Sequence, residues 1–232
     1  MEFAPEGPKA IPLWVNGHAF LTVTEGFHEV VNPLTGEARY RVPLCGREEA
    51  VAAVAAARAA RPLWAALTAQ AREDALEALA AALDRYRGHF AGLLQAETGF
   101  AEDQVLAEVA LALAALRGAA VGETGVVAIV VDATRPLAGF AEAAAPALRA
   151  GATVIVKPSP KAPSAAFALC ELSARAEWPA GVLNLMQGDS AAIEGLCGAD
   201  IDRLVFVGDA ALGARVGAIA DTAGKPFAML EG

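Results

Sequence analysis

The sequence predicts an α/β protein with a doubly wound parallel sheet, preceded by a strand and hairpin region and by a helical segment. Short runs of β-branched residues, such as Val126 to Val131 and Thr153 to Val156, are typical of strands covered on both faces. A stretch with helical spacing of apolar residues follows each run. Alternation of strands and helices builds parallel sheets with right-handed crossovers.

The first 45 residues are expected to form two small hairpin-like units. Asn16-Gly17 follows the apolar start at Leu13 and precedes the β-rich run Phe20 to Val23, which is a strong hairpin signal. A second turn, residues 32–36, separates Val30 and Val31 from a strand over residues 40–44. The predicted region 1–45 is therefore made of strands and turns.

Residues 46–120 have the composition and spacing of helices. The first helix is expected to break at Pro62. The second begins near Thr68, a favourable N-cap, and the third runs from about Glu102 to Leu116 and ends at Gly118. One continuous apolar stripe is predicted along the second helix, formed by Leu76, Leu79, Leu83, Tyr86, Phe90 and Leu93.

Residues 121–232 are expected to contain the βα units of the sheet, and the whole chain 1–232 is interpreted as a single domain. The predicted strands are residues 126–131, 153–156, 182–186, 204–207 and 227–230. The predicted helices are residues 137–149, 164–176, 191–196 and 210–220.

Charge and composition restrict the partners. The 18 Lys plus Arg against 27 Asp plus Glu give a formal net charge of −9, which argues against a nucleic-acid or anionic-membrane partner. The nearly uncharged stretch from Gly125 to Val131 is far shorter than the roughly 20 residues of a membrane span. The start Met1 to Glu6 does not resemble a secretory signal, and three cysteines cannot form a paired framework. A cytoplasmic protein is expected.

Several common chemistries are excluded by the absence of their motifs. The sequence contains no G-x-G-x-x-G, no Walker A loop, no C-x-x-C and no H-E-x-x-H. Its histidines are scattered singly, so no metal site is expected. Cys170 lies on the apolar face of a predicted helix and is interpreted as a small buried hydrophobe.

The predicted sheet offers one site, at the carboxyl ends of its strands. Ligands of open α/β sheets gather there because helix N-termini present unpaired amides and a positive dipole end. A nucleotide could lie across the three loops that follow residues 126–131, 153–156 and 204–207. The candidate residues in and beside these loops are Thr134, Lys157, Ser159, Gly208, Asp209 and Gly213.

Six motifs, in order and at similar spacing, resemble those of the aldehyde dehydrogenase superfamily. They begin at Asn32, Glu97, Pro146, Val156, Pro179 and Phe206, and read N-P-L-T-G-E, E-T-G, P-A-L-R-A-G, V-K-P-S, P-A-G-V-L-N and F-V-G-D. The resemblance covers nearly the whole chain and corresponds to the N-terminal, NAD-binding half of that family. It implies a Rossmann-type domain that binds NAD without the usual glycine fingerprint.

The resemblance also implies that the family's catalytic groups are missing. Family members use a cysteine thiolate beyond an E-L-G-G motif, and this chain ends where that motif falls. Thr134 stands opposite the family's oxyanion-stabilising asparagine. Leu230 stands where the basic glutamate belongs, and Glu231 is one position late. No catalytic residue is therefore assigned.

The cofactor site departs from the family pattern as well. Lys157 resembles the lysine that binds the adenosine ribose, but Pro160 replaces a polar or acidic residue. Asp209 replaces a serine beside the pyrophosphate, where its carboxylate would cap the helix and repel a phosphate. Binding of NAD or NADP is expected to be weak or lost. A solvated cation at Lys157, and close strand–helix packing at Gly208 and Gly213, are the simpler interpretations of these residues.

Two functional hypotheses follow from the resemblance. The first is a non-catalytic domain that serves as a structural or regulatory partner of another protein, for example a full-length aldehyde dehydrogenase. Only residues 118–124 fill the place of the family's oligomerisation hairpin, and the catalytic domain is missing, so covered surfaces would be exposed. The alternative is an NAD(P)-binding split subunit that acts when a second chain supplies the cysteine. A weaker third possibility is a cleft for another small ligand.

Overall fold

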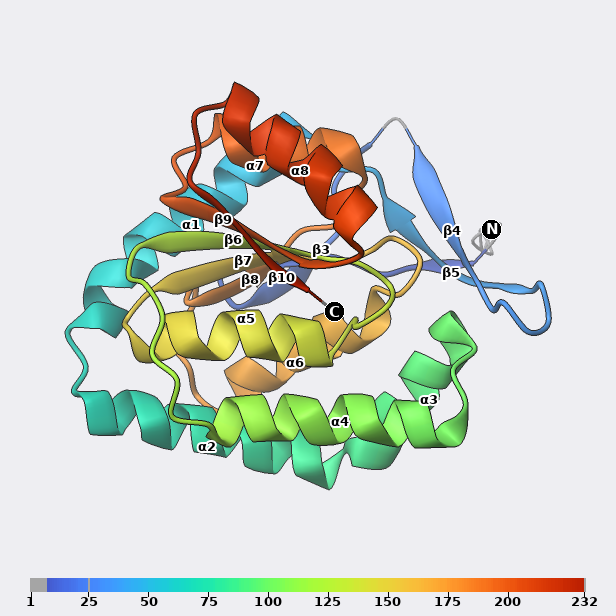
Figure 1. The fold of residues 1–232 in the computed structure, drawn as a ribbon, viewed down its shortest axis with the longest axis horizontal. Coiled ribbons are helices and arrows are strands. Elements are labelled where there is room, and N and C mark those ends of the chain that lie inside the picture. The colour runs from blue at the N-terminus through green and yellow to red at the C-terminus, as the bar shows by residue number, and fades with distance from the viewer. Residues whose placement is uncertain (1–7, 25, 232) are drawn as a thin grey trace, which may run out of the picture.

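A computed structural model describes residues 8–24 and 26–231; residues 1–7, which include the predicted start Met1 to Glu6, Glu25, Gly232 and the side chain of Glu231 lie outside the described part. Its main sheet has seven strands in the order β10-β9-β6-β7-β8-β2-β3, with β10 to β8 parallel (Figure 1). The predicted doubly wound α/β fold is confirmed. The strands are β2 (Leu13–Val15), β3 (His18–Phe20), β6 (Val126–Val131), β7 (Thr153–Lys157), β8 (Leu183–Leu185), β9 (Arg203–Gly208) and β10 (Phe227–Glu231).

Helices cover both faces of the sheet (Figure 1). One face carries α1, α7 and α8. The other carries α5 and α6, which are covered in turn by an outer layer of α2, α3 and α4. The helices are α1 (Arg47–Ala65), α2 (Ala69–Arg85), α3 (Arg87–Thr98), α4 (Glu102–Arg117), α5 (Ala138–Arg149), α6 (Ser164–Arg175), α7 (Ser190–Gly198) and α8 (Ala210–Thr222).

The core lies on both faces of the central strands. All six residues of β6 are buried, as expected for a strand covered on both sides. Val127 and Ile129 belong to the cluster beneath α5 and α6, and Val126 and Ala128 to the cluster beneath α1, α7 and α8. This alternation fixes the register of the strand, because a shift by one residue would exchange the two faces.

The two predicted hairpins are confirmed, but their surroundings differ. Asn16 and Gly17 have φ values of 53° and 76°, as a type I′ turn requires, and join β2 to β3. This hairpin extends the main sheet through β8, and the Asn16 N–H donates to Asn184 Oδ1 (3.0 Å). The second hairpin instead forms a separate three-stranded sheet, from β1 (Lys9–Ala10), β4 (Phe27–Val31) and β5 (Ala38–Pro43).

The expected break at Pro62 is wrong. Helix α1 continues to Ala65, because Pro62 lies in its last turn and removes only its own amide donor. The Ala66 N–H still donates to the Pro62 carbonyl oxygen (3.1 Å), and the fully buried Trp64 holds the turn against the core.

The continuous stripe along the second helix is also wrong. The helix is divided at Tyr86, whose φ and ψ of −101° and 16° interrupt it between α2 and α3. Beyond the interruption Leu94, rather than Leu93, is buried, and Tyr86 is exposed. Gly88, a poor helix former, lies directly after the change of direction.

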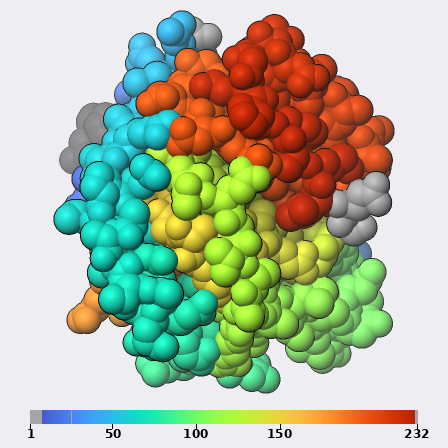
Figure 2. All heavy atoms as spheres, turned by 60° about the vertical axis from the view of Figure 1, so that its left-hand side comes forward, coloured from blue at the N-terminus to red at the C-terminus, as the bar shows by residue number. Residues whose placement is uncertain are grey.

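The short connection between α4 and β6 runs along the side of the molecule where β6 begins (Figure 1), the side that faces the viewer in Figure 2. The Gly122 N–H donates to the Pro146 carbonyl oxygen (2.8 Å). The buried Arg149 donates to the carbonyl oxygens of Leu116 and Ala120 at 2.5 and 3.4 Å, and Glu73 pairs with the same guanidinium. Residues 118–125 are therefore bound tightly to α5.

Candidate functional site

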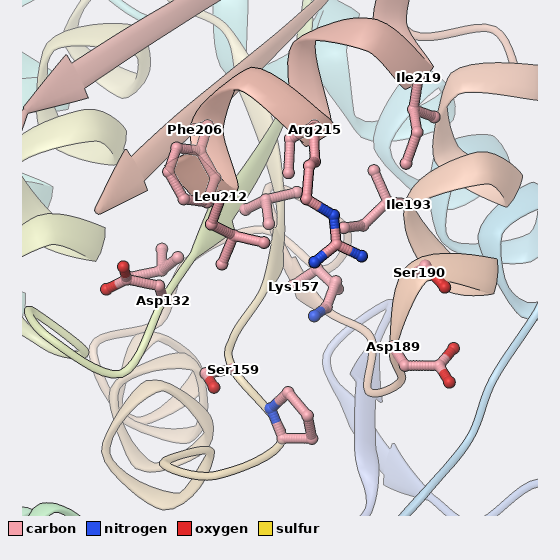
Figure 3. A pocket seen from close by; sticks show the side chains of 14 residues that line it. Asp132, Lys157, Ser159, Asp189, Ser190, Ile193, Phe206, Leu212, Arg215 and Ile219 are labelled. Carbon is pink, nitrogen blue, oxygen red and sulfur yellow. The ribbon is translucent and has the colours of Figure 1, made fainter. Parts of the chain in front are cut away.

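A cavity of about 290 Å³ opens at the carboxyl ends of β6, β7 and β9, between α7 and α8 (Figure 3). Its walls are largely apolar, with a few polar and charged side chains. The lining residues are Val130, Val131, Asp132, Lys157, Ser159, Pro160, Asp189, Ser190, Ile193, Phe206, Leu212, Arg215, Val216 and Ile219. The structure thus forms a cavity at the predicted edge of the sheet.

Lys157 is the last residue of β7, and its side chain points into the cavity (Figure 3). The residue is only 4% exposed. Burial lowers the pKa of its amine to about 8, against a smaller opposite effect from Asp189. Within residues 8–24 and 26–230 the amine makes no hydrogen bond or ion pair. The interpretation as a solvated cation is therefore wrong, because the side chain is buried.

Asp132 follows β6 directly and lies at one end of the cavity (Figure 3). It is 7% exposed and accepts hydrogen bonds from the N–H groups of Asp209 (2.7 Å) and Thr134 (2.7 Å). The Thr134 hydroxyl donates to the same carboxylate (2.5 Å). The carboxylate thus connects the ends of β6 and β9.

Gly208 leaves the space that this carboxylate fills. Its φ is +144°, and a Cβ atom at this position would lie 2.1 Å from the Asp132 carboxyl carbon. Close packing does explain this glycine, but the contact is with a carboxylate rather than with a helix. At Gly213 the packing interpretation holds as stated, since a Cβ there would lie 2.5 Å from the Met229 sulfur of β10.

Asp209 is the N-cap of α8, as the sequence predicts. Its carboxylate accepts from the N–H groups of Ala211 (2.9 Å) and Leu212 (3.1 Å). The Asp209 N–H itself is bound by Asp132. The amide donors of residues 209, 211 and 212 are therefore all bound by the protein's own carboxylates.

Only part of the predicted site is brought together. Lys157 and Ser159 line the cavity, whereas Thr134, Gly208, Asp209 and Gly213 do not. The sequence reasoning did not assign Asp132 or Arg215. The spacing Asp-x-Thr, which favours a turn closed by the aspartate, could have indicated Asp132. Arg215 carries no such signal, because its place in the cavity depends on how α8 packs on the sheet.

These residues fit one end of a dinucleotide and not the other. Lys157 and Ser159 offer an amine and a hydroxyl at the end where the resemblance places the ribose. At the diphosphate end, the N–H groups of residues 209, 211 and 212, which could otherwise donate to a phosphate, already donate to the carboxylates of Asp132 and Asp209. The diphosphate end therefore does not fit an anionic group.

None of the three thiols has the surroundings of a nucleophile. Cys45, Cys170 and Cys197 are all buried, and none lines the cavity. Burial raises the pKa of the Cys45 thiol to about 12, with a smaller contribution from Glu49. Burial also raises the pKa of Cys170 and of Cys197. The thiols are therefore protonated at neutral pH, as the packing interpretation of Cys170 requires.

Among the described residues, no group of three or more His, Cys, Asp or Glu side chains could hold a metal ion. No helix in the described ranges is long and apolar enough to cross a bilayer.

The open parallel sheet and its strand-end cavity define a nucleotide-binding type of α/β domain. The profile of the aldehyde dehydrogenase family matches residues 20–124 and 122–232, and the chain belongs to this family. The fold is accordingly that of a Rossmann-like NAD-binding domain.

The curated relatives are considerably longer proteins. A succinate-semialdehyde dehydrogenase [NADP(+)] of Escherichia coli K12 is 31% identical over 188 residues, which are 71% of this chain and 39% of the relative. A non-phosphorylating aspartate-semialdehyde dehydrogenase of Halomonas elongata is 33% identical over 226 residues, 86% of this chain and 45% of the relative. The chain therefore spans less than half the length of these relatives.

Solved structures of the family share the fold. A mutant of aldehyde dehydrogenase C from Pseudomonas syringae, in complex with NAD+ and octanal, superposes with a TM-score of 0.87 and 26% identity. The match covers 97% of this chain and 50% of that one. NAD(P) binding is thus a property of the family to which this half-length domain belongs.

Proposed function

We propose that this chain is a non-catalytic aldehyde-dehydrogenase-like domain that acts as a structural or regulatory partner of another protein. The observation that carries the proposal is the closed diphosphate end of its cavity, where Asp132 and Asp209 bind the amides that a cofactor phosphate would need. Hydride transfer to a nicotinamide cofactor requires that the cofactor bind first.

The thiols support the same conclusion. Aldehyde oxidation by family members begins with attack of a thiolate on the carbonyl carbon. The three thiols of this chain are buried and protonated, and the side chain of Thr134 donates to Asp132 rather than facing the cavity. These groups supply neither the nucleophile nor the oxyanion donor.

Exposed apolar side chains support a role as a partner. Several large ones are concentrated between Phe20 and Leu34, and Val23 is 99% exposed. In addition, β10 forms one edge of the main sheet. Apolar surface and an open strand edge are features that a second chain covers in an assembly. A full-length aldehyde dehydrogenase from the same cell is the first partner to test.

The second candidate, an NAD(P)-binding split subunit, is favoured by one observation. Lys157 and Ser159 line the cavity at the end that the resemblance assigns to the ribose. In that case this chain would hold the cofactor, and a second chain would supply the catalytic cysteine.

Two measurements separate the candidates. In the first, the purified chain is mixed with NAD and an aldehyde, and NADH formation is followed by absorbance; no turnover is expected. In the second, NAD is titrated by calorimetry, and no heat is expected at millimolar cofactor. Micromolar binding without turnover would establish the split subunit, and turnover by the chain alone would overturn both candidates. Sedimentation of the chain with a full-length family enzyme then tests the complex directly.

A further inference from the structure

One helix of the outer layer exposes an apolar face. Helix α4 lies on the outside of the molecule (Figure 1), and the one charged residue between Gln104 and Arg117, Glu108, is buried. The leucines at positions 106 and 111 are 53% and 44% exposed. A helix that is apolar on its solvent side is normally covered by another element. The exposed residues of this face are Leu106, Ala107, Ala110, Leu111 and Ala114.

A groove borders this face, between α3 and α4. It consists of two hollows of about 160 and 410 Å³, and Gly88, Ala91 and Leu106 line both of them. At Gly88 and Gly92 of α3, open space lies where a Cβ atom would be. Most of the other lining residues are apolar and belong to α4. The groove therefore has room for the side chains of another helix.

The two ends of the exposed face carry opposite charges. Asp103, in the first turn of α4, is exposed and forms no ion pair within the described ranges. Arg117, in the last turn, has a side chain that is 41% exposed and that pairs with two carboxylates of α2. Asp103, Ala110 and Arg117 are seven residues apart, which is close to two helical turns, so all three lie on one side of the helix.

A second copy of this chain fits both the apolar face and its charges. In a two-fold symmetric interface the same surface of both copies meets itself. If two α4 helices pack antiparallel with the axis at Ala110, Asp103 of one copy lies level with Arg117 of the other, because each is seven residues from the axis. By the same count Leu106 lies beside the smaller Ala114. A parallel arrangement would instead place like charges together.

We infer that the chain forms a symmetric dimer through α3 and α4, with the two copies of α4 antiparallel about Ala110. The inference goes beyond the proposed function, which concerns a different protein as partner. The apolar side chains between Phe20 and Leu34 and the edge strand β10 belong to other elements, so they stay available to that partner.

Sedimentation velocity of the full chain over a series of concentrations tests the dimer. The wild type should change from monomer to dimer in the micromolar range. Ala110→Glu should weaken dimerisation at least about 100-fold, because it places two carboxylates at the axis. Ala110 is exposed and glutamate is a good helix former, so the variant should keep the wild-type circular dichroism spectrum.

Two further comparisons make the test specific. Ala214→Glu, the same change at an exposed position of α8 on the opposite face of the sheet, is the control and should leave the dimer intact. Ala110→Lys should be monomeric by itself but should form a mixed dimer with Ala110→Glu, because the two positions meet at the axis. Added salt should weaken the wild-type dimer, and Asp103→Arg should weaken it about fivefold.

The inference would be overturned if the wild type stayed monomeric throughout the micromolar range, or if Ala110→Glu dimerised as well as the wild type. Failure of the two oppositely charged variants to associate would exclude an axis at Ala110. Loss of the dimer in Ala214→Glu would place the interface on α8 instead. None of these measurements contains aldehyde or NAD, so turnover by the chain would refute the proposed function and leave the dimer standing.

Discussion

On the two faces of the sheet, different kinds of residue accept hydrogen bonds from the N–H groups at the N-termini of the helices. On one face, the N-termini of α5 and α6 are capped by buried glutamates from the outer layer. Glu108 of α4 accepts from the N–H groups of Leu137 (3.1 Å) and Ala138 (3.0 Å), and Glu97 of α3 accepts from Ser164 (3.0 Å). On the other face, α7 and α8 are capped by their own exposed aspartates, Asp189 and Asp209.

The two kinds of cap indicate different roles for the two faces. The caps on the first face stabilise the fold, whereas those on the second face lie beside the candidate site. The glutamate caps connect layers that are far apart in sequence, so they stabilise the helical assembly. The aspartate caps lie beside the cavity and fill donors that a phosphate would use. Variants on the two faces should therefore affect different properties, stability on the first and ligand choice on the second.

The largest effect on stability is expected from Gly208→Ala. The new methyl group would collide with the Asp132 carboxylate at a residue with φ of +144°, so we expect a loss of about 2–4 kcal/mol in the free energy of unfolding, measured by urea denaturation. The double variant with Asp132→Ala should recover at least about 1 kcal/mol of that loss. A double variant no more stable than Gly208→Ala alone would contradict the contact.

Glu108→Ala should have the next largest effect. It leaves two buried amides of α5 without an acceptor, which we expect to cost about 2–3 kcal/mol in the same measurement. Glu102→Ala, at an exposed position of the same helix, is the control and should change stability little. Equal losses in the two variants would show that the long-range cap contributes nothing.

Glu97 should make stability depend on pH. Burial raises the pKa of its carboxyl to about 7, although Ser164 donates two hydrogen bonds to it. The folded state therefore holds a proton that the unfolded state releases near pH 4.5, and this contribution to stability is complete below pH 4.5 and lost as the pH rises to about 7.

Glu97→Gln keeps two hydrogen-bonding atoms and removes the titration. We expect it to flatten the pH dependence of the melting temperature between pH 4.5 and 7, and to stabilise the protein above pH 7 by an amount on the order of 1–3 kcal/mol. An unchanged pH profile would rule out Glu97 as its source.

The smallest effect on stability belongs to Asp209→Ser. Serine is an equally good N-cap, so we expect a change below about 0.5 kcal/mol. Its effect should fall on anions instead, since one carboxylate beside the amides of α8 is removed. A loss of more than about 1 kcal/mol in the free energy of unfolding would contradict this assignment.

The same comparison explains what could be predicted from the sequence. Caps that are close in sequence, such as Asp209 before α8, follow from residue preference and were predicted. Glu97 and Glu108 act on helices 67 and 30 residues away, so no local pattern reveals them. The doubly wound sheet followed from buried β-branched runs, and the hairpin from Asn16-Gly17.

The errors have two different causes. The sequence predicts a break at Pro62 because the spacing of apolar residues does not show that α1 ends only three residues later, at Ala65. The cavity residues Asp132 and Arg215 were missed for a different reason. Their roles depend on contacts of β6 with β9 and of α8 with the sheet, which only the packed structure defines.

The central claim is that the chain's own carboxylates close the diphosphate end of the cavity. Calorimetric titration of NAD into the wild type and into the variant with Asp132→Ala and Asp209→Ser tests it most directly. The account predicts no measurable binding to the wild type at millimolar NAD, and measurable binding to the double variant. Micromolar binding to the wild type, unchanged or weakened in the double variant, would contradict it.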